Sequence, residues 1–209
     1  MAIDRPGPGE ELNLGETTVP RPAATVIVLR GGKTALEVLL VKRNPEARFM
    51  GGAWVFPGGA VDREEGQGDA ALRAAAVREV AEEAGIHLPA PDQLVPFSRW
   101  ITPAQVKIRF DTWFYLAPLP AGAEPRVDGE EVVDARWYAP AGALQAATDG
   151  QLLLVFPTIK HLEQLSRFES ADHVLDYARS REIRPVEPRV VMLGEQARVL
   201  LPGEPGYDE

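Results

Sequence analysis

Three glutamates and one arginine near the middle of the chain have types and spacings that could do chemistry together. They are Arg78, Glu79, Glu82 and Glu83. The segment around them is rich in Ala, Leu, Glu and Arg, which favours a helix. On a helix, Glu82 and Glu83 follow Glu79 by three and four residues, so the carboxylates can converge. Like charges at this spacing repel by roughly 0.2–0.5 kcal/mol per pair, which Arg78 or a bound divalent cation would offset.

A divalent cation held by these carboxylates would support hydrolysis at phosphorus. Mg²⁺ and Mn²⁺ prefer oxygen ligands, and Mg²⁺ commonly combines one or two protein carboxylates with substrate phosphates and water. Such an ion would neutralise phosphate charge and could activate a water for attack. The alternative is a solvated acidic helix face without a ligand, which is common on protein surfaces.

The glutamates need a helix to carry them and a turn to face them. Asp69 is a good N-cap residue and Gly85 a good C′ residue, which predicts a helix between them. Its charged residues fall on one side, and the opposite side carries an apolar stripe of Ala76, Val77, Val80, Ala81 and Ala84. Before the helix, an apolar run leads into Phe56-Pro57-Gly58-Gly59, a turn whose backbone can approach a metal or phosphate.

This stretch resembles the Nudix box, G-x5-E-x7-R-E-U-x-E-E-x-G-U, in which U is a bulky apolar residue. Gly59 and Glu65 match the first half. The second half is matched by Arg78, Glu79, Val80, Glu82, Glu83, Gly85 and Ile86. Twelve residues separate the halves instead of seven, and we expect the additional ones in the Gly66-Gln67-Gly68 loop. The first glutamate of the box is therefore left open between Glu65, Glu64 and Asp62.

The resemblance implies a fold, a reaction and a set of site residues. The fold is an α/β/α sandwich with a mixed β-sheet. The reaction is metal-dependent hydrolysis of a nucleoside diphosphate linked to another moiety. The cofactor is Mg²⁺ or Mn²⁺, and its expected ligands are Glu79, Glu82, Glu83 and the backbone of Gly59. The expected catalytic residues are Glu82, Glu83 and Arg78, with Arg78 orienting the glutamates.

The general base stays open in this interpretation. In the wider family it is sometimes an acid outside the box, and Glu130 and Glu131 are candidates. Gly58 is expected to lie beside the substrate.

A second resemblance precedes the box. The coenzyme A diphosphatase branch of the Nudix family, peroxisomal mammalian-type members included, carries L-L-T-x-R-(S/A)-x3-R-x3-G-x3-F-P-G-G. The residues in register are Leu39, Leu40, Arg43, Arg48, Gly52 and Phe56-Pro57-Gly58-Gly59. Val41 and Asn44 depart from the pattern. This resemblance implies that coenzyme A or an acyl derivative is cut to 3′,5′-ADP and a phosphopantetheine.

Arginines would be needed to bind such a substrate. Coenzyme A carries a diphosphate and a separate 3′-phosphate, and Arg43 and Arg48 could hold these oxygens in bidentate fashion. The alternative is that both are solvated cations. Arg109, in an R-F-D-T pattern that also looks like this branch, could contact substrate or could pair only with Asp111 or Glu130.

Two other functions remain open. One is hydrolysis of ADP-ribose or NADH. The other is a non-catalytic Nudix module that binds a nucleotide to regulate a partner, although such modules usually lose carboxylates of the box.

Bulk composition narrows the class of protein. The net charge of −9 argues against a general nucleic-acid binder, so the expected partner is a small nucleotide. The absence of cysteine excludes disulfides and thiolate chemistry, which suits a cytoplasmic protein. We find no signal-peptide pattern and no apolar run long enough to span a bilayer, so no membrane partner is expected.

The chain reads as an arm followed by one domain. Residues 1–21, with several Pro, Gly and Glu, predict a flexible arm, and residues 22–209 a single domain whose helical and hairpin extension begins at about residue 150. Strands are predicted at Ala23–Leu29, Leu36–Lys42, Val106–Leu116 and Glu130–Tyr138, with a loop at Trp100–Pro103. Helices are predicted at Pro140–Ala147 and after N-caps at Thr158 and Ser170, and a hairpin at Arg189–Leu201. The later helices should cover the sheet or form a homodimer contact, and Pro202–Tyr207 should fold near the site or fray.

Overall fold

The computed structural model describes residues 13, 15, 17–33, 35–47, 49–193 and 196–208. Its strands are β1 (Arg21–Arg30), β2 (Glu37–Arg43), β3 (Trp54–Val55), β4 (Gly58–Ala60), β5 (Val95–Ile101), β6 (Phe110–Pro118), β7 (Val132–Tyr138), β8 (Pro185–Val186), β9 (Arg189–Leu193) and β10 (Gln196–Leu200). Its helices are α1 (Asp69–Ala84), α2 (Pro140–Thr148), α3 (Phe156–Leu165) and α4 (Ala171–Arg179), with short 3-10 turns at Arg63–Glu65 and Pro91–Gln93. Most of the predicted N-terminal arm lies outside the described residues.

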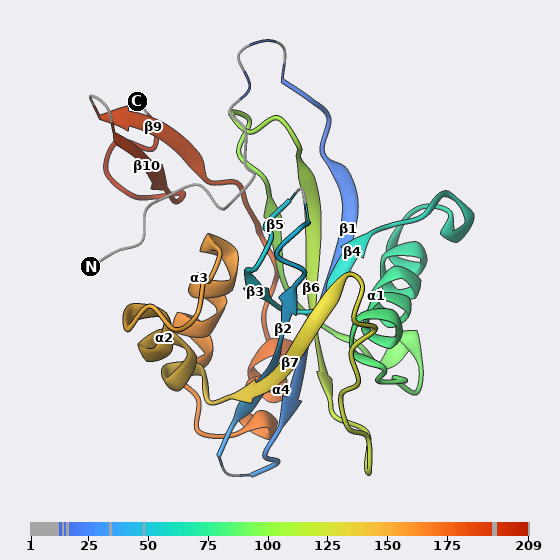
Figure 1. The fold of residues 1–209 in the computed structure, drawn as a ribbon. Helices are drawn as coiled ribbons and strands as arrows, with labels where there is room; N and C mark the ends of the chain where they lie inside the picture. Colours follow the sequence, from blue (N-terminus) through green and yellow to red (C-terminus); the bar gives the residue numbers. More distant parts are fainter. Residues whose placement is uncertain are drawn as a thin grey trace.

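The main sheet is mixed. Its strand order is β3-β2-β1-β6-β5-β8, with β4 paired to β1 and β7 to β2. The long β1–β6 pair is parallel, whereas β1–β2, β2–β7 and β5–β6 are antiparallel. Figure 1 shows β1 and β6 side by side at the centre, with the β9–β10 hairpin set apart from the main sheet.

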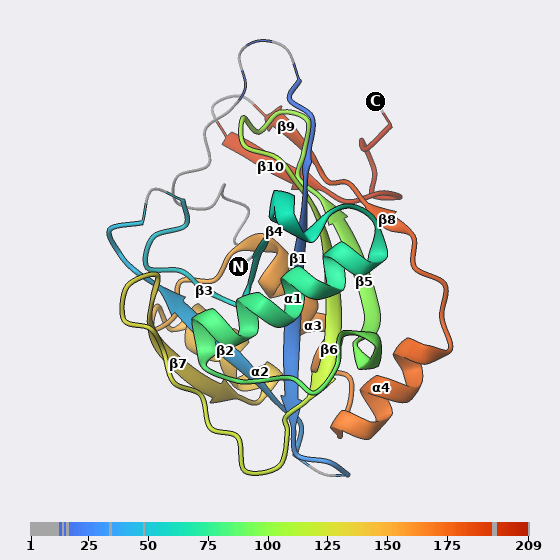
Figure 2. The same cartoon turned by 90° about the vertical axis from the view of Figure 1, so that its right-hand side faces the viewer.

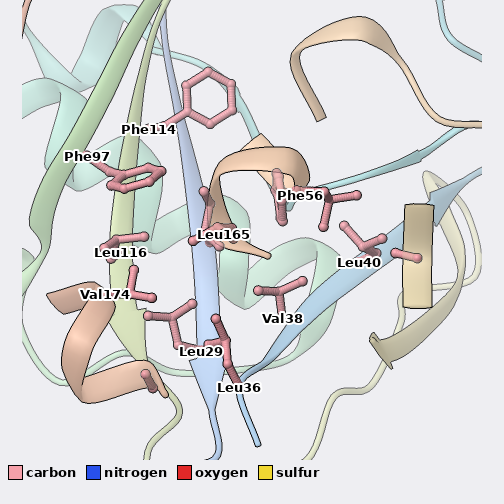
Figure 3. Packing of buried hydrophobic residues seen from close by; sticks show 14 of the residues in the cluster. Leu29, Leu36, Val38, Leu40, Phe56, Phe97, Phe114, Leu116, Leu165 and Val174 are labelled. Carbon is pink, nitrogen blue, oxygen red and sulfur yellow. The ribbon is translucent and has the colours of Figure 1, made fainter. Parts of the chain in front are cut away.

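Apolar side chains bury both faces of this sheet, and β1 shows how. Because successive side chains of a strand point to opposite faces, Ile27 joins one apolar cluster and Val26 the other. Helices α2, α3 and α4 complete the first cluster, and Figure 3 shows Leu165 of α3 in the same packed cluster as Leu29. Helix α1 covers the opposite face, in front of β1 in Figure 2. The predicted mixed α/β fold is confirmed, and the helices beyond residue 150 cover the sheet.

Several predicted boundaries shift. Gly68, not Asp69, is the N-cap of α1, because the Asp69 carboxylate accepts a hydrogen bond from Arg73 at 2.6 Å instead. Gly85 ends α1 in a left-handed conformation, as predicted. The strand predicted from Val106 begins only at Phe110, and Trp100 belongs to β5 rather than to a loop.

The C-terminal elements follow the prediction in part. Ser170 caps α4 by accepting a hydrogen bond from the His173 amide. Helix α3 begins at Phe156, before the predicted N-cap Thr158, because Pro157 fits the first helical turn. The predicted hairpin forms from β9 and β10, with its turn residues outside the described ones. None of the described helices combines the length and apolarity needed to cross a membrane.

A buried histidine joins α3 to the sheet. His161 is 1% exposed and lies among the rings of Phe97 and Phe114. Its Nδ1 donates to the Pro157 carbonyl at 2.6 Å, because that oxygen can only accept. Its Nε2 therefore accepts from the Ser98 hydroxyl, also at 2.6 Å. Burial lowers the pKa of His161 from the ordinary 6.5 to about 4.

This histidine should make stability pH-dependent. Between pH 6.5 and about 4 the unfolded chain protonates His161 and the folded chain does not, so stability is full above pH 6.5 and falls as the pH drops. The expected loss is about 1.4 kcal/mol per pH unit. We expect the free energy of unfolding of the wild type to fall faster than that of His161→Gln between pH 6.5 and 4.5, measured by urea denaturation. Parallel curves for the two proteins would show that His161 does not titrate in this way.

Candidate active site

A cavity of about 500 Å³ opens between the N-terminal part of β1, α1 and the C-terminal segment. It brings together five of the predicted site residues, which are Arg43, Gly58, Gly59, Glu79 and Glu83. The two glutamates come from α1 and the two glycines from β4. The cavity therefore has a carboxylate end where this helix and this strand face each other.

Strand β4 holds the glycine turn against α1. Gly58 and Gly59 pair with Thr25 and Ala24 of β1, so the turn is fixed to the centre of the sheet. The Gly58 amide donates to Oε2 of Glu83 at 2.9 Å. A Cβ atom at Gly59 would overlap the Glu79 carboxylate. The structure thus explains Gly59 of the box by the closeness of its backbone to the Glu79 carboxylate.

A single methyl group should therefore damage the site. In Gly59→Ala the new Cβ must displace the Glu79 carboxylate, and we expect metal affinity and turnover to fall by about 10- to 100-fold, as for other changes that misorient a metal ligand. Calorimetric titration with Mn²⁺ and steady-state kinetics measure both effects. The matched control is Gly142→Ala in α2, where the nearest atom lies 3.9 Å from the new Cβ and turnover should not change. Equal behaviour of the two variants would contradict the prediction.

Glu83 is the most buried of these carboxylates. Glu83 is 3% exposed, and burial raises the pKa of its carboxyl to about 7. The hydrogen bond from the Gly58 amide works in the opposite direction and lowers this pKa. Burial also raises the pKa of Glu79. Among the described residues, the cation that pairs with Glu83 is Arg43, whose Nη1 lies 3.7 Å from Oε1. The placement of Glu83 on the polar, opposite side of α1 was wrong, because β4 covers this part of the helix.

Arg78 binds the remaining glutamates. Its Nη1 donates to Glu79 at 2.7 Å and to Glu82 at 2.9 Å. Its Nε and Nη2 donate to the two carboxylate oxygens of Glu65 at 3.0 and 3.3 Å, and Nη2 also reaches the Ala60 carbonyl at 3.1 Å. The Glu65 hydrogen bond is the main reason why the pKa of Arg78 is raised.

The contacts of Arg78 favour Glu65 as the first glutamate of the box. Its side chain is 13% exposed and holds Arg78 with both oxygens, whereas Asp62 is 60% exposed and lies 3.6 Å from the guanidinium. Burial works to raise the pKa of Glu65, but the hydrogen bonds from Arg78 and the Asp62 amide outweigh it and lower this pKa.

Glu82 lies apart from the cavity. Its side chain is 59% exposed and is bound to Arg78 at the solvent edge of the group. The three glutamates of α1 therefore do not converge in this structure, and no cluster of three or more potential ligand side chains is found among the described residues.

The residues that line the cavity nevertheless fit a divalent cation. Glu79 and Glu83 are two largely buried carboxylates whose pKa values are raised, first by burial and then by neighbouring negative charge, so a bound cation would stabilise their ionised forms. Two protein carboxylates are also what Mg²⁺ commonly uses beside phosphate and water.

The predicted arginines have different positions. Arg43 lines the cavity, and its buried Nε has no hydrogen-bond partner among the described residues. Arg48 lies outside the described residues. Arg109 is 7% exposed and does not line the cavity, because its guanidinium donates to the carbonyls of Thr18 and Thr102 and to Glu187 at 2.6 Å. The prediction that Arg109 contacts substrate, or else pairs with Asp111 or Glu130, is therefore corrected to a structural role.

One charged residue of the cavity, Arg21, was not singled out by sequence, whereas Glu131, which also lines it, was a candidate for the general base. Arg21 lines it with Ala23 and Thr25, and the alternation of side chains along β1 could have indicated this shared face. Glu131 also lines the cavity, whereas Glu130 does not. The charge of Glu131 contributes to the raised pKa of Glu79 and Glu83.

Comparison with known proteins identifies the family to which this fold belongs. A model of the NUDIX domain matches residues 19–155, which include every lining residue from β1, β4 and α1. A presumed nudix hydrolase of Caenorhabditis elegans, nudix hydrolase 7, is 28% identical over 214 residues, covering 85% of this chain and 71% of that protein.

Solved structures share the fold as well. The NUDIX hydrolase from Alicyclobacillus acidocaldarius superposes with a TM-score of 0.68 at 29% identity, over 76% of this chain and 96% of that chain. The MutT NUDIX hydrolase from Burkholderia pseudomallei gives a TM-score of 0.54 at 26% identity, over 70% and 98%. The chain therefore belongs to the NUDIX family and is a Nudix hydrolase.

Proposed function

We propose that this protein hydrolyses the diphosphate bond of a nucleoside diphosphate linked to another moiety. The observation that carries the proposal is the pair of buried carboxylates, Glu79 and Glu83, at one end of a cavity with a free arginine donor beside them. Nudix hydrolases generally use divalent metal ions, and a bound Mg²⁺ or Mn²⁺ would neutralise phosphate charge and make a water more acidic.

The residues of the chain have distinct tasks in this proposal. Glu79 and Glu83 hold the cation, and the Gly59 carbonyl supports them. Arg78 keeps Glu79 in place through its hydrogen bond of 2.7 Å. Glu82 belongs to the same set by resemblance, at its exposed edge.

Glu131 is the better placed of the two open candidates for the general base. It lines the cavity near Glu79 and Glu83, whereas Glu130 does not line it. A carboxylate in this position could accept the proton of the attacking water. Glu131→Gln should therefore lower turnover where Glu130→Gln does not, and equal losses would remove Glu131 from this role.

Coenzyme A or an acyl derivative is the first choice of substrate. The signature from Leu39 to Gly59 supports it, and Arg43 has a free donor for a phosphate oxygen beside Glu83. ADP-ribose or NADH is the second choice, because either would place a diphosphate at the same carboxylates. A regulatory module without catalysis is disfavoured, since Glu79, Glu82 and Glu83 are all retained and Arg78 binds Glu79.

Product analysis by mass spectrometry tests the function and the substrate together. The protein is incubated with Mg²⁺ or Mn²⁺ and coenzyme A, with ADP-ribose and NADH in parallel and Glu83→Gln as the control. We expect 3′,5′-ADP from coenzyme A with the wild type alone. Turnover of only ADP-ribose or NADH would overturn the choice of coenzyme A, and no turnover of any of them would favour the regulatory module.

A further inference from the structure

The β9–β10 hairpin adds an apolar wall to the active-site cavity. Val190 of β9 and Val199 of β10 are cross-strand partners, and both line the cavity. Their neighbours Val191 and Arg198 form the adjacent pair, which points to the other face of the hairpin and does not line the cavity. The hairpin lies outside the main sheet, so its position depends on other contacts (Figure 1).

Polar contacts fix the base of this hairpin. Strand β8 pairs with β5 and leads directly into Glu187, which accepts a 2.6 Å hydrogen bond from the buried Arg109. The Tyr207 hydroxyl donates to the Glu187 carbonyl at 2.7 Å, so the C-terminal segment holds the same point. The Val190 amide also donates to the Gln105 side chain at 3.4 Å. These contacts explain why Arg109 is buried away from the cavity.

The wall lies some distance from the carboxylates. Arg109 and Phe110 stand at the level of Arg21, three residues along β1 from Ala24, which pairs with Gly59. At about 3.3 Å per residue this is roughly 10 Å along the strand. A substrate whose diphosphate lies at Glu79 and Glu83 must therefore extend to reach the hairpin.

The surface offered there is mainly apolar and partly exposed, and the charged residue at this level is Arg21, whose guanidinium lies over the Phe110 ring. Ile108 also lines the cavity and is 45% exposed, so its side chain is accessible to a bound group. Val106 beside it is buried at 3% and continues the apolar surface. Ligand pockets of about 300–1,000 Å³ are typically lined by apolar side chains with a few polar groups. The cavity of about 500 Å³ therefore leaves room for an apolar group beside a diphosphate.

We propose that the C-terminal hairpin binds an apolar group carried by the substrate, with Val190 and Val199 as its specificity-determining residues. The inference rests on the proposed function, because it assigns the part of a nucleoside diphosphate substrate remote from the scissile bond. It makes an acyl thioester of coenzyme A with about four to eight acyl carbons a better ligand than free coenzyme A. It also gives Arg109 and Glu187 a positioning role, since they hold the base of the wall.

Calorimetric binding to Glu83→Gln separates affinity from turnover. The probes are free coenzyme A and its butanoyl, hexanoyl and octanoyl thioesters, with Mg²⁺ present. Each methylene that becomes buried should raise affinity by up to about fourfold. In Glu83→Gln combined with Val199→Asp, each added methylene should raise affinity little or not at all. The control, Glu83→Gln with Arg198→Asp, places an aspartate on the other face of the hairpin and should keep the full gain, although it changes the net charge of the protein more than Val199→Asp does.

Two further measurements make the outcome independent of folding and of substrate identity. Val199→Ala, which leaves no buried charge, should reduce the gain in part, and circular dichroism verifies that each variant is folded. The fluorescence of 1-anilinonaphthalene-8-sulfonate reports an apolar site without any nucleotide, and its binding should weaken with Val199→Asp but not with Arg198→Asp. If coenzyme A esters do not bind while this contrast persists, the substrate choice fails and the hairpin site stands. If Val199→Asp and Arg198→Asp behave alike in both assays, the hairpin proposal is overturned.

Discussion

Replacing Glu83 with glutamine should lower turnover by about 100-fold or more, because changes to residues that merely orient metal ligands already cost about 10- to 100-fold. Glutamine keeps the shape of the side chain, and its carbonyl oxygen can still accept the hydrogen bond of the Gly58 amide. It removes the negative charge of the carboxylate that we propose as a ligand of the cation. The loss should therefore appear in metal-dependent turnover and in Mn²⁺ affinity.

The same change should not weaken the fold. Burial raises the pKa of Glu83, which shows that the folded protein disfavours its ionised form. A neutral glutamine avoids this penalty, so we expect the midpoint of thermal unfolding at pH 8 to be equal to or above that of the wild type. Glu163→Gln, an exposed acid that pairs with Lys160 at 3.0 Å, is the control for the loss of one carboxylate. Turnover above a tenth of the wild-type value in Glu83→Gln would rule out the assigned role.

Replacing Arg78 with alanine should impair both activity and stability. The guanidinium connects Glu65, Glu79, Glu82 and the Ala60 carbonyl, so its removal leaves several partly buried acceptors without a donor. We expect turnover to fall by about 10- to 100-fold, the usual effect of losing a residue that orients metal ligands. Kinetics with increasing Mn²⁺ and thermal unfolding measure the two losses.

A lysine should replace Arg78 poorly. It keeps the charge but not the planar fork that reaches Glu65 with two nitrogens, so Arg78→Lys should recover only part of the activity. Arg73→Ala is the control on the same helix, because Arg73 pairs with Asp69 and does not line the cavity. Its turnover should match that of the wild type at temperatures where it is folded. Full activity of Arg78→Lys would show that charge alone is needed.

Local physics in the sequence determined α1 and its neighbours. The helix formers before Gly85, the glycine turn ahead of them and the β-branched run of β1 each favour one conformation over short distances. The box spacing also placed Glu79 and Glu83 on one helix, one turn apart. These features need no distant partner, which is why they could be predicted.

The tertiary structure alone decided which of those side chains face the cavity. The charge pattern suggested one polar side for Glu82 and Glu83, but the pairing of β4 with β1 covers and buries Glu83, whereas Glu82 is bound to Arg78 at the solvent edge. Arg109 was misassigned for a similar reason: its partner Glu187 is 78 residues away, and no local pattern connects them.

The β9–β10 hairpin also combines a feature that sequence predicts with a position that only the tertiary structure decides. A hairpin near the C-terminus could be predicted from its residues, but its place beside the glutamates of α1 could not. That place follows from the β5–β8 pair and from the contacts of Arg109 and Tyr207, all between segments distant in sequence. Sequence by itself determined the helix, the turn and the candidate chemistry. The tertiary structure decided which charges are buried and what surrounds the substrate, because burial and long-range pairing depend on the whole fold.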